Sequence, residues 1–296
     1  MQRFFKFLKL SAMAPAESSA SRPCTPSSPA KLSAYEGLSH PPHHAKPSIV
    51  TALSIKVDDG PDGAVPGFLH LPPTSSSHST STAAILLSGA GGGIVGPSSI
   101  YLSLADKLSS LKHPVPALRL DYRYPARNKY CVKDVVAAMD YLEQRHHINK
   151  FVLVGWSFGG APVFTVGGMD KRVVGCATVA SQTAETDGIR SLAPRPLFLL
   201  HGTGDRCLSY SCSERLYAQY GSKGDRELKL FDGDDHALTR NSLKAEKLIG
   251  TFVLKCAGVG LDGEDDAALE EQLVNEAEKV GLMKKGGDLR RNESVE

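Results

Sequence analysis

The stretch from Phe151 to Gly160 constrains the fold of this chain more than any other. It reads as four consecutive apolar residues, the turn sequence Gly-Trp-Ser-Phe-Gly-Gly, and an apolar segment that begins at Ala161. This order is typical of a buried strand that turns sharply into a helix, because bulky side chains beside so tight a turn would collide with it. Such a turn places Ser157 at the carboxyl edge of a sheet and aims the backbone N–H of Phe158 at the same space. The sequence therefore predicts a strand–turn–helix unit that presents a serine hydroxyl.

Short apolar runs alternate with helix-length segments through most of the chain. Eight runs read as strands: Ile49–Val57, Gly67–Leu71, Ala83–Leu87, Val115–Leu120, Lys150–Val154, Val173–Val179, Pro196–Leu200 and Glu227–Phe231. The first two form a predicted hairpin, and strand–helix alternation follows. This pattern predicts the α/β class: a single-domain, three-layer α/β/α sandwich with a mostly parallel sheet of about eight strands. Ligands bind at the carboxyl edge of such sheets.

Two later loops at the same predicted edge carry an acid and a histidine. Asp205 ends the sequence His-Gly-Thr-Gly-Asp after one buried run, and His236 ends Asp-Gly-Asp-Asp-His after the next. A serine hydroxyl is a weak nucleophile unless a base takes its proton and a third group orients that base. Ser157, His236 and Asp205 are therefore the candidate catalytic nucleophile, base and acid. The other aspartates near His236 are expected to form the turn.

The order Ser157, Asp205, His236 along the chain resembles that of the α/β-hydrolase superfamily, over residues 50–258. The layout is similar to compact, dienelactone-hydrolase-like serine esterases. This resemblance implies a serine hydrolase that cleaves a carboxylester, thioester or lactone of a small molecule through an acyl-enzyme. Dienelactone hydrolase itself has a cysteine nucleophile, so its substrate is not carried over. Only 16 residues separate Val179 from Pro196, too few for the cap domain of some members, so we expect an open site.

The glycine-rich segment Ser88–Gly93 follows the predicted strand Ala83–Leu87. In the family that the chain resembles, this loop supplies the second N–H group of the oxyanion hole. We expect the N–H of Ala90, or that of Gly91, to serve together with that of Phe158. Glycines let the backbone approach a developing negative charge closely.

Two other functions are compatible with parts of the sequence. The segment 91–96 also reads Gly-x-Gly-x-x-Gly, and the next predicted strand leads to Asp121, as a dinucleotide-binding oxidoreductase requires. That alternative leaves the serine, the acid and the histidine without a role. The second alternative is a non-catalytic protein of the same fold that acts as a scaffold or small-molecule receptor.

The two ends of the chain differ in composition from its middle. Residues 11–48 hold 7 of the 18 prolines and 9 serines, so residues 1–48 are predicted to be a disordered leader before a domain over 49–258. Residues 259–296 form an acidic tail, with 11 acids and 5 bases after residue 260. Leu269, Leu273, Ala277 and Val280 predict one amphipathic helix of about four turns there. We expect this helix to be solvated, or to contact a partner.

Composition excludes several classes of protein. The 34 basic residues nearly balance the 32 acidic ones, which argues against a nucleic-acid partner, and no apolar run is long enough to span a membrane. The six cysteines are scattered, as expected of free thiols in a cytoplasmic protein. A mitochondrial transit peptide at the N-terminus is the alternative localisation signal. We expect no metal and no organic cofactor.

Overall fold

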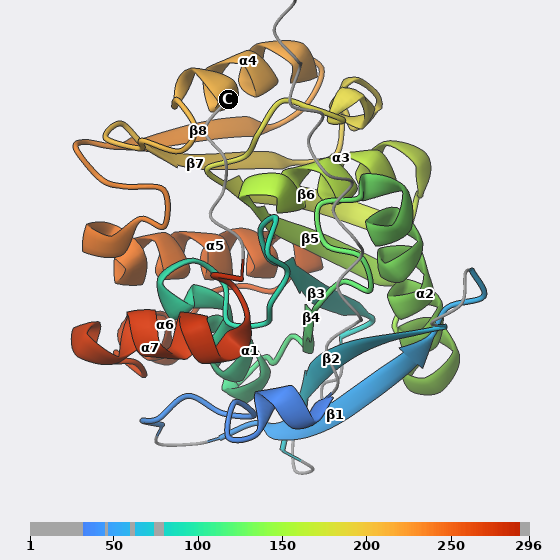
Figure 1. Cartoon of the computed structure of the whole chain (residues 1–296), viewed down its shortest axis with the longest axis vertical. Coiled ribbons are helices and arrows are strands. Elements are labelled where there is room, and N and C mark those ends of the chain that lie inside the picture. The colour runs from blue at the N-terminus through green and yellow to red at the C-terminus, as the bar shows by residue number, and fades with distance from the viewer. Residues whose placement is uncertain (1–31, 45–46, 60–62, 74–79, 291–296) are drawn as a thin grey trace, which may run out of the picture.

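A computed structural model describes residues 32–44, 47–59, 63–73 and 80–290; the leader prediction for residues 1–31 lies outside them. Its centre is an eight-stranded sheet of order β1-β2-β4-β3-β5-β6-β7-β8 (Figure 1). The strands are β1 Ile49–Lys56, β2 Ala64–Leu71, β3 Thr82–Leu87, β4 Ala117–Leu120, β5 Lys150–Trp156, β6 Val173–Val179, β7 Leu197–Gly202 and β8 Arg226–Phe231. β2 pairs antiparallel with β1 and β4, and all other pairs are parallel. The predicted hairpin and mostly parallel sheet are confirmed.

Helices cover both faces of the sheet, as the predicted three-layer sandwich requires (Figure 1). The helices are α1 Ile100–Ser110, α2 Asn128–His146, α3 Gly160–Met169, α4 Ser211–Tyr220, α5 Ser242–Ala257, α6 Gly263–Glu270 and α7 Glu276–Gly286, with 3₁₀ turns η1 Leu32–Tyr35, η2 Pro97–Ser99, η3 Ser157–Gly159, η4 Asp187–Ser191 and η5 Thr239–Asn241. β5 shows why the layers form: Val152 and Val154 pack against α1 and α5, whereas Phe151 and Leu153 pack against α2 and α3. The continuous apolar run is therefore buried on both faces.

The connection from β6 to β7 contains only the short turn η4, so no cap domain is inserted there. In the part of the chain that the structure describes, no helix is long and apolar enough to cross a membrane.

The end of the predicted leader packs against the domain, which differs from the disorder expected through residue 48. The side chains of Tyr35 and Leu38 are buried in the core beside α1. Arg119 of β4 donates hydrogen bonds to the carbonyl oxygens of Leu38 (2.7 Å) and Ser39 (2.8 Å). Residues 32–44 are therefore part of the folded domain.

Leu38→Ala is expected to lower the free energy of unfolding by about 2–4 kcal/mol, because it removes a fully buried side chain from the core. The measurement is chemical denaturation of the full chain. Leu261→Ala, at a position 38% exposed, is the control and should change stability by less than about 0.5 kcal/mol. If Leu38→Ala and Leu261→Ala had the same free energy of unfolding, residues 32–44 would not unfold together with the rest of the domain.

The acidic tail also differs from the expectation of one solvated helix. Two helices replace it, and the chain is extended between them. Leu269, Leu273 and Met283 are buried, whereas Val280 of the predicted apolar stripe is 52% exposed. α6 packs against α1 and α5, and α7 packs against η2. Of the predicted apolar stripe, Leu269 and Leu273 are thus buried within the domain, whereas Ala277 and Val280 are exposed.

Candidate active site

Ser157 lies in a sharp turn between β5 and α3, as the sequence predicts. Its backbone has φ = 54°, a left-handed conformation that costs a residue other than glycine about 1–2 kcal/mol. A Cβ at Gly155 would lie 2.5 Å from the carbonyl oxygen of Gly159, and one at Gly159 would lie 2.7 Å from those of Leu87 and Ser88. The flanking glycines therefore allow the close approach that the turn needs. The same contacts bring the turn against the start of the glycine-rich loop.

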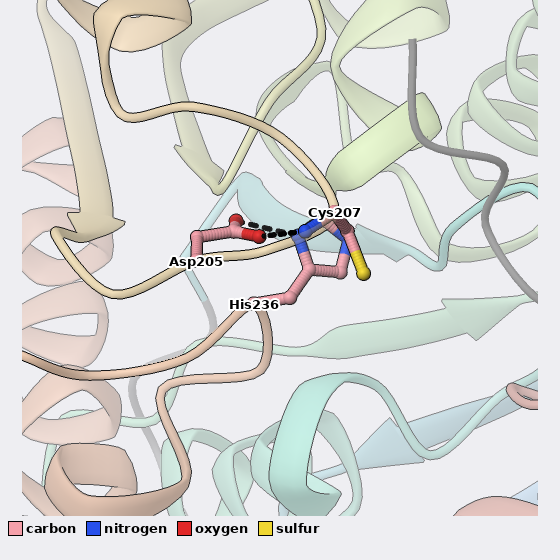
Figure 2. A group of neighbouring side chains, drawn as sticks. All are labelled: Asp205, Cys207 and His236. Atoms are coloured by element: carbon pink, nitrogen blue, oxygen red, sulfur yellow. Dashed lines mark hydrogen bonds and ion pairs between the residues drawn. The ribbon is translucent and has the colours of Figure 1, made fainter.

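The predicted acid and base are joined by a hydrogen bond. Nδ1 of His236 lies 2.7 Å from Oδ2 of Asp205, and Figure 2 shows the imidazole facing this carboxylate. The two loops that carry them are tied together, since Thr203 donates its N–H to the carbonyl of Phe231 and Gly204 donates to that of Asp234 (both 2.9 Å). The pair thus forms where β7 and β8 end side by side.

Asp205 is held as a carboxylate. Burial disfavours the charge, but hydrogen bonds from His201 and His236 and from backbone N–H groups outweigh it and hold the pKa of Asp205 well below its usual range. The N–H groups are those of Cys207 (2.7 Å) and Leu208 (2.9 Å), which both donate to Oδ1. A carboxylate so held can orient the imidazole of His236 and stabilise its protonated form.

His201 is a site residue that sequence reasoning did not assign. Its Nε2 lies 3.1 Å from Oδ2 of Asp205, and its Nδ1 lies 2.7 Å from the hydroxyl of Ser213 in α4. The ring is fully buried. His201 thus contacts Oδ2, the oxygen that His236 also contacts, whereas the backbone donors bind Oδ1. Its place four residues before Asp205, at the end of a buried strand, was the available signal.

The aspartates near His236 form its turn, as expected. Asp234 is buried and accepts hydrogen bonds from the N–H groups of Asp235, Arg240 and Asn241. Asp235 accepts the N–H groups of Ala237 and Thr239. With their carboxylates used in this way, they shape the loop.

Trp156 supports the histidine from the strand side. Its indole N–H donates to the carbonyl of His236 (3.0 Å), and the two ring centroids are 5.5 Å apart. Trp156 is the residue before Ser157, so this contact fixes the histidine loop beside the turn. Trp156 thus packs at the turn and also lines the cavity beside the histidine.

A cavity of about 620 Å³ opens beside the histidine. Its walls include Trp156, Cys207, His236, Arg240, Met283 and Leu289. Ser157 has no exposed surface and His236 is 8% exposed, so the site is less open than the missing cap suggested. Met283, Asp288 and Leu289 of the C-terminal segment form part of the wall of this cavity.

Two buried carboxylates, those of Asp288 and Asp121, accept hydrogen bonds from the glycine-rich loop and from the residues that follow it. Oδ1 of Asp288 accepts the hydroxyl of Ser88 (2.6 Å) and the N–H of Gly96 (2.7 Å), and Oδ2 accepts the N–H of Val95 (3.1 Å). Oδ1 of Asp121 accepts the N–H of Gly93 (2.7 Å). We name the segment 286–290 the tail strap, because it ties this loop to the C-terminal end.

The structure argues against the dinucleotide alternative. Asp121, the expected ribose-binding acid, is fully buried, and Oδ2 accepts the hydroxyl of Tyr35 and the guanidinium of Arg290. With Oδ1 used by backbone N–H groups, neither oxygen is left for a ribose.

The predicted oxyanion residues lie in the expected elements. Phe158 follows Ser157 in η3, and Ala90 and Gly91 lie in the loop after β3. The ring of Phe158 packs edge-on against Tyr122 (5.9 Å between centroids), whose hydroxyl donates to the carbonyl of Ser88. The turn and the loop are therefore packed as one unit.

One group of side chains among the described residues could hold a metal ion. It consists of Asp205, Cys207 and His236, whose ligand atoms all lie within 4.8 Å of one another (Figure 2). Cys207 was considered in the sequence only as a thiol and is a second residue of the site that was missed.

Comparisons with known proteins agree with this architecture. The profile of the alpha/beta hydrolase fold family matches residues 93–237, which include the serine, acid and histidine. The uncharacterized protein YfhR of Escherichia coli is 28% identical over 128 residues, covering 35% of this chain and 44% of YfhR. The chain thus matches less than half the length of the curated relatives.

Solved structures show the same fold at low sequence identity. Est1E from Butyrivibrio proteoclasticus has a TM-score of 0.57 at 16% identity, covering 70% of this chain and 99% of that one. Dienelactone hydrolase from Anabaena variabilis has a TM-score of 0.59 at 16% identity, covering 70% and 98%. XC6422 from Xanthomonas campestris, a serine hydrolase without a lid, has a TM-score of 0.53 at 13% identity, covering 72% and 97%. With its sheet order, turn and loops, the chain has the α/β-hydrolase fold.

Proposed function

We propose that the protein is a serine hydrolase that cleaves an ester-like bond of a small molecule: a carboxylester, a thioester or a lactone. The observation that carries this proposal is the Asp205–His236 pair (2.7 Å) held beside the strained turn of Ser157. Strained backbone conformations cluster at active sites, where the surrounding structure holds them in place. A non-catalytic scaffold would have no need of a left-handed serine next to an oriented imidazole.

The reaction proceeds through an acyl-enzyme. The hydroxyl of Ser157 attacks the acyl carbon while Nε2 of His236 takes its proton, and the N–H groups of Phe158 and Ala90, with Gly91 as the alternative, stabilise the oxyanion. The protonated His236 then gives its proton to the departing alcohol or thiol as the acyl bond breaks. Water attacks the acyl-enzyme by the same route and releases the acid and Ser157.

A fluorophosphonate probe tests this proposal without knowledge of the substrate. The full-length protein should gain the mass of one phosphonyl group, and peptide mass spectrometry should locate it on Ser157. His236→Ala should slow labelling strongly, since the serine then keeps its proton at neutral pH. Absence of labelling in folded wild-type protein would favour the scaffold.

Asp205→Asn is expected to reduce turnover of a p-nitrophenyl ester on the order of 10⁴-fold. The amide keeps the shape of the acid, but its NH₂ group favours the wrong imidazole tautomer in His236. Asp232→Asn, an exposed acid of the neighbouring loop, is the matched control and should keep wild-type turnover. Steady-state kinetics with circular dichroism distinguish lost chemistry from lost fold. Wild-type turnover in Asp205→Asn would remove Asp205 from the triad.

A further inference from the structure

Cys207 lies next to the catalytic pair and has no role in the mechanism proposed above. It is a thiol outside any disulfide, is partly exposed, and lines the cavity together with His236. Figure 2 shows its sulfur on the side of the imidazole ring away from the Asp205 carboxylate. A soft sulfur ligand and an imidazole thus face the same cavity at close range.

Asp205 is committed to orienting the ring. Its two oxygens already accept hydrogen bonds from two histidines and two backbone N–H groups. Nδ1 of His236 is held by that carboxylate, so the nitrogen that can bind an ion at the cavity is Nε2. A carboxylate that holds the far nitrogen of an imidazole is the usual support of a metal-binding histidine. The arrangement that orients His236 toward a serine therefore also prepares it for a metal.

The ligand types select the ion. Thiolate and imidazole are the ligands that Zn²⁺ and related soft cations prefer, whereas Mg²⁺ and Ca²⁺ require oxygen ligands. Bonds of about 2.3 Å to sulfur and about 2.0 Å to nitrogen let one ion bridge a thiolate and an imidazole that line the same cavity, once the two side chains adjust. Water in the cavity can complete the coordination.

We propose that Cys207 and His236 form an inhibitory binding site for a thiophilic divalent cation of the zinc class. Binding releases the thiol proton of Cys207 and joins the metal to the thiolate sulfur and to Nε2 of His236. An imidazole bound in this way cannot take the proton of Ser157, so the ion and the reaction exclude each other. The inhibitory part rests on the proposed function, but the binding part does not.

The binding test uses Cd²⁺, because its bonds to thiolates absorb in the near ultraviolet. Full-length Ser157→Ala, which retains the proposed ligands, is titrated with Cd²⁺ under reducing, chelator-free conditions, in parallel with Ser157→Ala/Cys207→Ala. Alanine keeps the backbone N–H that Cys207 donates to Asp205. Ser157→Ala/Cys212→Ala is the matched control, because Cys212 lies five residues away in α4 and outside the group. Surface histidines do not contribute to a thiolate band.

In Ser157→Ala and in the Cys212 control, we expect the near-ultraviolet absorption to rise with added Cd²⁺ and to saturate at the intensity of one Cd²⁺–thiolate bond. In the Cys207 variant, we expect this absorption to be lost. A band that persists without Cys207 would overturn the proposal. The proposal would also be overturned if Ser157→Ala/His236→Ala bound Cd²⁺ with the same affinity as Ser157→Ala, because the ion would then bind the cysteine alone.

The inhibition test measures p-nitrophenyl ester turnover of the wild-type protein with Zn²⁺, each variant being normalised to its own rate without metal. Half-inhibition is expected to need at least about tenfold more Zn²⁺ in Cys207→Ala than in wild type or Cys212→Ala. EDTA should restore activity, and Mg²⁺ should not inhibit.

Equal Zn²⁺ sensitivity of all three proteins would overturn the proposal. A wild-type protein with no turnover and no fluorophosphonate labelling would refute the proposed function instead, and the Cd²⁺ titration would still report on the site.

Discussion

Ser157→Ala is expected to reduce turnover of a p-nitrophenyl ester by roughly 10⁴–10⁶-fold and to abolish fluorophosphonate labelling. No other group in the proposed reaction can form the acyl-enzyme, so the loss should appear in kcat. The fold should survive, because alanine keeps the Cβ and needs no new space. Steady-state kinetics and thermal unfolding of the same preparations are the measurements.

The combination with His236→Ala gives a sharper test, because the members of a triad act as one unit. The double variant should be no slower than the worse single variant, within a few fold. Ser209→Ala, an exposed serine of the acid loop, is the control and should retain wild-type turnover. Ser157→Ala with wild-type kcat would refute the serine-hydrolase proposal.

The backbone at Ser157 adds a prediction about stability within the same experiment. With φ = 54°, alanine stays strained at this position, whereas glycine adopts the conformation freely. Ser157→Gly should therefore be about 1 kcal/mol more stable than Ser157→Ala in chemical denaturation, with both inactive. Equal stability of the two would show that the turn is relaxed in solution.

The features that the sequence predicts correctly are those encoded locally. The turn at Ser157 needs small neighbours at defined positions, so its glycines are visible in the sequence. The apolar runs of the buried strands are visible for the same reason, because both faces of the sheet are covered. Asp205 and His236 could be placed because each lies in the loop after a predicted strand, and parallel strands bring their carboxyl ends to one edge.

The contacts that were missed join segments far apart in the chain. Ser88 and Asp288 are 200 residues apart in sequence, and nothing near Asp288 distinguishes it from the surrounding charges. The number of acidic residues in the tail therefore predicted a solvent-exposed helix, although the carboxylate of Asp288 is buried. The break between the two tail helices did have a local signal, the capping box of Asn275 and Glu278. The single apolar stripe outweighed it.

The tail strap leads to the largest stability effect that we expect. Asp288→Ala would leave three buried donors without an acceptor: the hydroxyl of Ser88 and the N–H groups of Val95 and Gly96. Each such loss costs about 1–3 kcal/mol, so the total is expected to be at least ~3 kcal/mol. Turnover should fall as well, since the loop that loses its anchor carries Ala90. The control Asp58→Ala removes an exposed acid and should change stability by less than about 0.5 kcal/mol.

The pH dependence of the free energy of unfolding tests whether folding changes the pKa of the Asp288 carboxyl. Burial, together with the neighbouring carboxylate of Asp121, raises the pKa of Asp288 to about 7, against the three hydrogen bonds that lower it. The unfolded chain has a carboxyl pKa near 3.8, so between these values the folded state binds the extra proton and stability falls as pH rises. The stability of wild type relative to Asp288→Asn should thus be highest near pH 4, decline up to about pH 7 and be constant above it. Denaturant titrations of both proteins across this range measure the difference. A difference that does not change with pH would show that the carboxyl has the same pKa in both states, and that the strap holds the loop without the cost of a buried charge.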